Sequence, residues 1–342
     1  MRKLVTAAAA VAAAALAAGC SSASGSSGSG GSVGNAQVTL RLGFLANITH
    51  APALVGVDKG IFAKALGKSV TLSVKVFDSG TEEATALLAG QLDAAYVGPN
   101  PAINAWSKSG GKAIKIISGA AAGGASVVVK KGITSVQQLK GKSLATPSLG
   151  NTQDVALRYW LKQNGLTTTA TGGGDVSIRP TTPNSAAVLE FTSGQIAGGS
   201  EPSPYNVEMV QAGGTTLLTE TGVTTNLVVT QSFLTAHASA VNGLLEGQIQ
   251  ANDYIAKDPA AAQAAANAEL TKLVGKGIKS SVLPAAFKEI TFTDNPDAAS
   301  LAQDAREAEA VGLLSTVNLN GIYDLGPLNT LLQKAGEPQV SG

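Results

Sequence analysis

The sequence predicts an α/β fold made of two similar lobes, each built on a largely parallel sheet. Short apolar stretches with strand-like patterning alternate with segments in which apolar residues recur at helical spacing. Such alternation predicts parallel strands covered by helices. The chain from about Gln37 to Gly342 is also long enough for two cores. The strand-like stretches are 38–42, 70–77, 113–117 and 126–129, and the first helical segment is 52–65.

A weak internal repeat supports the division into two lobes. Residues 81–95 can be laid over residues 185–199, because each segment has a helical pattern that ends at a Gly-Gln pair and continues into a short buried strand. Residues 44–53 and 146–156 form a second pair, in which a strand, a polar loop and a helix follow one another. We therefore expect two lobes of similar construction.

The first 36 residues predict export and attachment. Residues 1–20 have a short cationic start and an Ala-rich apolar stretch that is too short to span a bilayer, which is typical of a secretory signal segment. The residues ending at Cys20 resemble a bacterial lipobox, in which the cysteine is lipidated and becomes the first residue of the mature protein. The alternative is ordinary cleavage after an alanine, with Cys20 incidental. Residues 21–36 are mostly Ser and Gly, which predicts a flexible linker.

Composition argues against several classes of function. The chain has 24 Lys plus Arg against 23 Asp plus Glu, so its net charge of +1 gives no reason to expect a nucleic-acid partner. Cys20 is the only cysteine, which excludes disulfides and thiol catalysis from the mature domain. His50 and His237 lack metal-ligand spacing, and no Walker loop or Gly-x-Ser-x-Gly motif occurs. We expect no enzyme activity, no metal and no cofactor.

Several motifs resemble one known family. They look like those of the substrate-binding lipoproteins of ABC importers for aliphatic sulfonates, nitrate and taurine, and the similarity covers nearly all of 38–335. The resemblance implies a two-lobed type II periplasmic-binding-protein fold that closes on a small solute and presents it to a membrane permease. It also implies a lipid-anchored monomer at the outer face of the cytoplasmic membrane or in the periplasm. The motifs occupy 47–54, 88–101, 149–158, 201–202 and 321–325.

By this analogy the chain crosses between the lobes twice. The first crossing is expected near 123–125, because paired glycines permit the unusual dihedral angles of a hinge. The second is expected near 225–227. Gly124 and Ser126, beside the first crossing, are included among the expected ligand contacts. Lobe one would comprise 37–124 and 228–342, and lobe two would comprise 125–227.

The binding site is expected where two polar loops precede helices. A helix N-terminus offers free backbone N–H groups and a partial positive charge, which suit an anion such as a sulfonate or nitrate. Two such ends, at Thr49 and at Thr152, would face each other across the cleft. Each polar side chain in these loops has helix capping as an alternative role. The side chains expected to donate hydrogen bonds are Asn47, His50, Asn100, Asn151, Thr152 and Gln153, with His50 carrying a charge if protonated.

Glu201 is the residue that bears most on ligand class. A carboxylate in the cleft would repel a simple anion but would pair with the ammonium group of a zwitterion such as taurine. It could instead cap the segment after Pro202 or bind a donor from lobe one on closure. Further hypotheses are nitrate or bicarbonate, a pyrimidine precursor of thiamine contacted by Tyr96, Trp160 and Glu201, an enzyme of the same fold, and a non-transport surface sensor.

Overall fold

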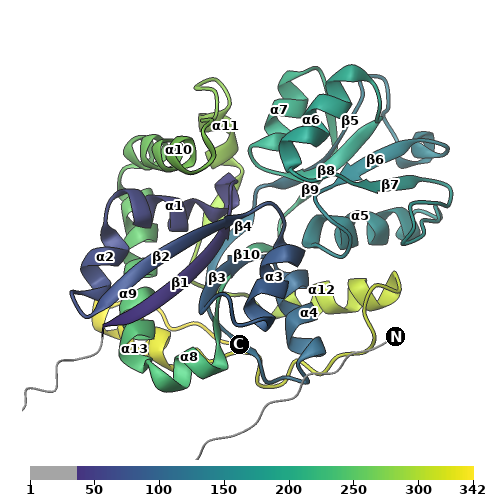
Figure 1. The fold of residues 1–342 in the computed structure, drawn as a ribbon. Helices are drawn as coiled ribbons and strands as arrows, with labels where there is room; N and C mark the ends of the chain where they lie inside the picture. Colours follow the sequence, from purple (N-terminus) through teal and green to yellow (C-terminus); the bar gives the residue numbers. More distant parts are fainter. Residues whose placement is uncertain (1–36) are drawn as a thin grey trace, which may run out of the picture. The chain divides into compact units, whose positions relative to one another are not determined.

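Residues 37–342, the part of the chain that the computed structural model describes, contain two β-sheets that define two lobes (Figure 1). Residues 1–36, with the expected signal segment, Cys20 and the expected linker, lie outside the described residues. The strands of lobe one are β1 (Val38–Leu45), β2 (Val70–Phe77), β3 (Ala94–Val97), β4 (Ile114–Gly123), β10 (Val223–Thr230) and β11 (Ile290–Phe292). Those of lobe two are β5 (Ala125–Val129), β6 (Ser143–Thr146), β7 (Ser177–Pro180), β8 (Gly198–Pro202) and β9 (Thr215–Glu220).

The two sheets repeat one topology. Their strand orders are β2-β1-β3-β10-β4-β11 and β7-β6-β8-β5-β9, so the first five positions of lobe one correspond to the five of lobe two. In each sheet the first three strands are parallel, whereas β10 and β5 run antiparallel to both of their neighbours. The α/β class is thus confirmed. Four strands of each sheet run in one direction, and β10 and β5, the strands next to the crossings, run against it, as does β11 at the edge of lobe one.

Helices cover both faces of each sheet. In lobe two, α5 packs on one face, and α6 and α7 pack on the other. The helical elements of lobe two are η2 (Val136–Leu139), α5 (Thr152–Gln163), α6 (Asn184–Ser193) and α7 (Tyr205–Gln211). Those of lobe one are η1 (Ile48–His50), α1 (Ala51–Asp58), α2 (Ile61–Leu66), α3 (Gly80–Leu88), α4 (Pro99–Lys108), α8 (Gln231–Ala236), α9 (Ala238–Lys257), α10 (Pro259–Val274), α11 (Leu283–Lys288), α12 (Ala298–Ala310) and α13 (Gly326–Ala335).

The core of lobe one has two layers, one on each side of its sheet. One apolar cluster joins the sheet to α1, α2, α9, α10 and α13, and the other joins it to α3, α4 and α12. The single helix expected over 52–65 is two helices, because Gly60 adopts a left-handed conformation with φ of 64° and ends the first. α1 is therefore short, and its N-terminal end lies close in sequence to the end of β1.

The chain changes sheet between β4 and β5, at Gly123 and Gly124, and again between β9 and β10, at Thr221 and Gly222. Both glycines of the first crossing have positive φ values, of 70° and 74°. The second crossing lies earlier than the expected 225–227, which is inside β10 and pairs with β3 and β4. Every residue of this central strand is buried.

Among residues 37–342, no helix is long and apolar enough to cross a membrane.

Candidate functional site

A small cavity lies between the two lobes, at the edges where the parallel strands end. Its empty volume is about 350 Å³, but the centre of a water molecule can occupy only about 20 Å³ of it. Space of that size holds one or two waters. The cavity therefore has room for a small solute only. Fourteen residues line it: Leu45, Asn47, Thr49, His50, Gly80, Gly98, Pro101, Pro147, Asn151, Thr152, Gln153, Asn184, Pro202 and Thr224.

The lining follows the structural repeat. Each lobe contributes the loop after one strand (β1 or β6), the start of the helix that follows its parallel neighbour (α3 after β2, α6 after β7), and residues at or just after the end of a third strand (β3 or β8). These are the carboxyl ends of parallel strands, where open α/β sheets bind ligands. Gly80 of α3 corresponds in this way to Asn184 of α6. Thr224, in the second crossing region, completes the wall.

Lobe one presents the turn η1, in which the side chains orient one another. The Thr49 hydroxyl donates to Asn47 Oδ1 at 2.7 Å. The Leu45 backbone N–H donates to His50 Nδ1 at 3.2 Å, so that the proton of the neutral ring is on Nε2. Burial lowers the pKa of His50 to about 3. His50 therefore serves as a neutral N–H donor, and the charged form considered from sequence does not apply near neutral pH.

Lobe two presents the N-terminus of α5. Asn151 caps the helix, since its Oδ1 accepts from the Asp154 backbone N–H at 2.9 Å, and its Nδ2 donates to Gln153 Oε1 at 2.9 Å. The N–H groups of Thr152 and Gln153 belong to the first turn and have no acceptor within the helix. This end therefore combines backbone donors with the partial positive charge of the helix.

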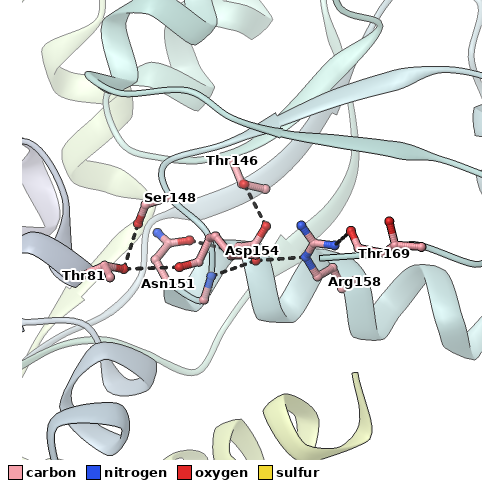
Figure 2. Close-up of polar contacts among 9 residues, drawn as sticks. Thr81, Thr146, Ser148, Asn151, Asp154, Arg158 and Thr169 are labelled. Carbon is pink, nitrogen blue, oxygen red and sulfur yellow. Dashed lines mark hydrogen bonds and ion pairs between the residues drawn. The ribbon is translucent and has the colours of Figure 1, made fainter. Parts of the chain in front are cut away.

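A buried ion pair supports this helix end (Figure 2). Asp154 accepts from the Thr146 hydroxyl, the Gly150 N–H and Arg158 Nε, each at 2.9 Å, and Arg158 Nη1 donates to the Thr169 carbonyl at 2.7 Å. The Asp154 and Arg158 side chains are 0% and 2% exposed. Because Arg158 balances the carboxylate, Asp154 can hold the Gly150 loop without leaving an uncompensated negative charge beside an anion site.

Polar atoms without partners point to an occupant of the cavity. The Thr152 hydroxyl is buried and has no hydrogen-bond partner among the described residues, and neither has Asn184 Oδ1. Buried polar groups are normally satisfied. Gly98 of lobe one lies close to Thr152, since a Cβ atom at Gly98 would be 2.6 Å from the Thr152 hydroxyl oxygen. The absence of a side chain at Gly98 allows the lobes to approach.

Hydrogen bonds between the lobes hold the closed arrangement. The Ile48 N–H in the η1 turn donates to the Ser203 carbonyl at 2.9 Å, and the Tyr205 hydroxyl donates to the Ala46 carbonyl at 3.0 Å. Farther along, the hydroxyls of Thr81 and Ser148 lie 3.0 Å apart (Figure 2). The structure is thus a closed form, which explains the small size of the cavity.

No Asp, Glu, Lys or Arg is among the described residues that line the cavity, and residues 37–342 contain no group of three His, Cys, Asp or Glu side chains placed to hold a metal ion. The site's polarity comes from amides, hydroxyls, backbone N–H groups and one neutral imidazole. Such donors suit a singly charged oxyanion.

Of the ten residues expected to contact ligand, six line the cavity and four do not. Asn100 instead donates to the Asp304 carbonyl at 3.2 Å. Gly124 accepts from the Ser203 N–H through its carbonyl, and the Ser126 hydroxyl accepts from Asn206 Nδ2. The six that line the cavity are Asn47, Thr49, His50, Asn151, Thr152 and Gln153.

Glu201 is the fourth residue outside the cavity lining. It lies on β8 opposite Ser126, is 0% exposed, and neither of its carboxyl oxygens has a partner among the described residues. Burial raises the pKa of Glu201 well above its usual value, and the negative charge of Glu220 adds to this. Because Glu201 is not among the residues that line the cavity, the carboxylate expected to pair with a ligand's ammonium group is not found there.

The lining also includes residues that the sequence reasoning missed. Gly80 and Asn184 lie outside the family-like motifs, yet the internal repeat that joins 81–95 to 185–199 could have indicated the starts of α3 and α6. Gly98 lies inside the 88–101 motif but was not expected to contact the ligand. The remaining missed residues are Leu45, Pro101, Pro147, Pro202 and Thr224.

A model of the NMT1-like family matches residues 34–270 of the chain, which is more than half of its length. The chain belongs to this family. It is 29% identical over 162 residues to a protein of Brucella abortus named as a binding protein, and the match spans 47% of this chain and 46% of that one. The chain therefore spans about half the length of the curated relatives it matches.

Solved structures share the fold at low sequence identity. The alkanesulfonate-binding protein SsuA of Xanthomonas axonopodis pv. citri, bound to MOPS, has a TM-score of 0.70 and 17% identity, covering 84% of this chain and 99% of its own. The nitrate-binding protein NrtA of Synechocystis has a TM-score of 0.70 and 15% identity, with 88% and 90% coverage. DSZB in complex with biphenyl-2-sulfinic acid also matches, at a TM-score of 0.63 and 16% identity, with 87% and 99% coverage. These likenesses confirm the two-lobed periplasmic-binding-protein fold.

Proposed function

We propose that this protein is the extracytoplasmic solute-binding component of an ABC importer and captures a small sulfonate-type anion by closure of its lobes. The observation that carries the proposal is the cavity between two helix ends, lined by neutral donors from both lobes. The unpartnered Thr152 hydroxyl in that cavity supports it. A permease in the membrane would receive the solute when the lobes open.

The cavity favours a simple, short alkanesulfonate over taurine. About 20 Å³ for water centres suits a sulfonate head group and little more. Taurine would need an acceptor for its ammonium group, and Glu201, which we expected to supply one, is outside the lining. A sulfonate group needs only donors, which the two helix ends provide.

Nitrate or bicarbonate is the second candidate, because the small size of the cavity favours these anions as well. Both anions would use the same neutral donors. A flat anion presents its oxygens in one plane, whereas the three oxygens of a sulfonate point in directions that would let donors of both helix ends reach them.

A pyrimidine ligand and an enzyme activity have less support. Tyr96 is fully buried and donates to Gln248 Oε1 at 2.5 Å, and among the described residues no Phe, Tyr or Trp lines the cavity, so stacking of a pyrimidine has no platform there. An enzyme would need a base or nucleophile. His50 Nδ1 already accepts a backbone N–H, so its other nitrogen carries a proton and donates.

A direct test is calorimetric titration of methanesulfonate, ethanesulfonate, taurine, nitrate, bicarbonate and a thiamine pyrimidine precursor. At 100 times its Kd, a bound solute should add about 2.7 kcal/mol of stability, which a thermal shift detects. We expect the short sulfonates to bind, and Gln153→Ala together with Thr152→Ala to weaken them. The proposal is wrong if none of the anions binds, or if both substitutions leave the sulfonate Kd unchanged.

Transport can be tested separately in the host. A strain lacking the gene should lose growth on ethanesulfonate as sole sulfur source, and the intact gene should restore it. Unchanged growth of the strain that lacks the gene would instead indicate a non-transport sensor.

Attachment through Cys20 is part of the proposal. Cys20→Ala should move the protein from the membrane fraction to the soluble fraction after salt washing, because the acyl chains at Cys20 would be lost. Ser21→Ala is the matched control and should leave the protein membrane-bound. Unchanged retention of the Cys20→Ala variant would contradict lipid anchoring.

A further inference from the structure

One carboxylate of lobe one binds two buried side chains of lobe two. Glu289 Oε2 lies 2.7 Å from Asn206 Nδ2 and 3.1 Å from the Ser203 hydroxyl. Ser203 is 0% exposed and Asn206 is 1% exposed. Both side chains also contact groups in their own lobe, since the Ser203 hydroxyl is 2.9 Å from Asn206 Oδ1 and Asn206 Nδ2 is 3.0 Å from the Ser126 hydroxyl.

Glu289 is fixed beside the hinge. It stands between α11 and β11, and the next residue, Ile290, pairs with Gly123 at the hinge end of β4. The carbonyl oxygen of Glu289 is so close to this strand that a Cβ atom at Gly123 would lie 2.8 Å from it. Because its backbone belongs to lobe one, the contacts of its carboxylate with Ser203 and Asn206 form only when the two lobes are close together.

Ser203 connects this carboxylate to the cavity. The Ser203 carbonyl accepts from Ile48 N–H at 2.9 Å, and Ile48 lies between Asn47 and Thr49, which line the cavity. The Ser203 N–H donates to the Gly124 carbonyl at 2.7 Å. One residue of lobe two is therefore bonded to the hinge, to Glu289 and to the turn that presents ligand donors.

We propose that Glu289 is a positioning residue that latches the closed form and thereby slows ligand release, although it does not touch the cavity. The choice of a small anion as the ligand rests on the proposed function, whereas the latch rests on the contacts of Glu289. A hydrogen bond from a neutral amide to a carboxylate is stronger than one between neutral groups. Opening at this side would leave the Asn206 amide without that acceptor.

The test compares Glu289→Ala, which removes the acceptor, with Glu289→Gln, which keeps an oxygen at the same place. Lys288→Ala is the matched control, because it removes the exposed charged side chain of the adjacent residue. The full chain is used with Cys20→Ser, so that spin labels attach only at two introduced cysteines. Lys68→Cys in lobe one and Gln195→Cys in lobe two replace exposed residues for this purpose.

Two readouts separate the latch from the ligand. Pulsed electron spin resonance gives the distribution of distances between the labels, with and without ethanesulfonate or nitrate, and stopped-flow kinetics gives the association and dissociation rates of those anions. We expect Glu289→Ala to lengthen the label distance and to raise the dissociation rate about tenfold with little change in association. Glu289→Gln should fall between the native chain and Glu289→Ala, because it keeps an oxygen acceptor but loses the charge, and Lys288→Ala should behave like the native chain.

Three outcomes would overturn the latch. The first is that Glu289→Ala changes neither the label distance nor the dissociation rate. The second is that Glu289→Gln is as impaired as Glu289→Ala. The third is that the native chain never shows the shorter label distance of the closed form. A latch effect in a chain that binds neither anion would refute the proposed ligand alone. Anion binding that is indifferent to Glu289 would refute the latch alone.

Discussion

The two helix ends that meet at the cavity are built in different ways. The N-terminus of α5 is complete within lobe two, because Asn151 caps it and the Asp154–Arg158 pair holds the preceding loop. The η1 turn before α1 has no side-chain cap, and its Ile48 N–H finds its acceptor at Ser203, in the opposite lobe. One end is therefore pre-organised, whereas the other is completed when the lobes close.

This difference suggests an order of events for a bound anion. The solute would first meet the pre-organised donors of Thr152 and Gln153, whose N–H groups need no further rearrangement. His50 and Asn47 would then be brought over it by closure. The comparison is sharpened or broken by changing one end at a time.

The largest effect is expected from Arg158→Met, which leaves the Asp154 carboxylate buried without its cation. Breaking a buried pair costs about 3 to 5 kcal/mol of unfolding free energy. Anion affinity should fall as well, because an uncompensated negative charge would stand beside Thr152. Urea unfolding and calorimetric titration of ethanesulfonate measure the two effects.

Arg41→Met is the matched control in lobe one. The Arg41 side chain is 43% exposed where it pairs with Asp93, so we expect a loss of about 1 kcal/mol and an unchanged Kd. Equal losses of unfolding free energy in Arg158→Met and Arg41→Met would show that the contribution of the Arg158 pair to stability does not come from its burial.

Gly98→Ala tests the close approach of the lobes. The added Cβ would lie 2.6 Å from the Thr152 hydroxyl oxygen in the closed form, and the φ of −64° at Gly98 is ordinary for alanine. Overpacking of about 1 to 3 kcal/mol would weaken binding by about 5- to 150-fold. Thr152→Ala in the same chain should recover part of the loss caused by Gly98→Ala.

Gly326→Ala is the control for Gly98→Ala, since a Cβ there would meet nothing nearer than 3.9 Å. Its Kd should equal that of the native chain. If Gly98→Ala also binds normally, the lobes do not approach at this point in the liganded state.

Thr152→Val and Thr49→Val compare the two helix ends directly. The Thr152 hydroxyl is unpartnered, so its removal should cost little stability but about 1 to 3 kcal/mol of binding to a charged ligand. The Thr49 hydroxyl is already bound to Asn47, so its removal should cost stability and weaken binding only a few-fold. A reversed order of the two Kd values would mean that lobe one supplies the dominant donors.

Much of the fold could be predicted because it repeats. The pairs of similar segments indicated two lobes, and they placed both polar loops at equivalent positions, since strand ends and helix starts have local sequence signals. The second crossing was placed by analogy alone, and Thr225 and Asn226, although polar, lie inside a central buried strand. Local polarity cannot report burial that comes from neighbouring strands.

The site was only partly predictable for a related reason. Loops with donors such as Asn151 and Thr152 are visible in a sequence, but Gly98 matters for what it lacks, and its role depends on Thr152 in the other lobe. Glu201 is adjacent to Pro202 in the chain, yet only Pro202 lines the cavity. Successive residues of a strand face opposite sides of the sheet, so proximity in sequence did not place Glu201 in the site.

The smallest expected effect concerns His50 and pH. Because burial lowers the pKa of His50 to about 3, the ring stays neutral from pH 5 to 8, and sulfonate affinity should not rise on acidification through this residue. Stability should change instead. In the unfolded chain the histidine takes up a proton below its usual pKa of about 6.5, and the folded protein does not, so the free energy of unfolding falls by about 2 kcal/mol between pH 6.5 and pH 5.

The control for this prediction is His50→Gln. Raised pKa values of buried carboxyls, such as that of Glu220 at about 7, change stability with pH in the opposite direction, so the contribution of His50 is isolated as the difference between the native chain and His50→Gln. Urea unfolding of both chains at pH 5, 6.5 and 8 measures that difference. An ethanesulfonate affinity that rises toward pH 5 in the native chain but not in His50→Gln would show that the imidazole becomes charged over the ligand, and lobe one would then hold the anion by charge while lobe two holds it by pre-organised dipoles.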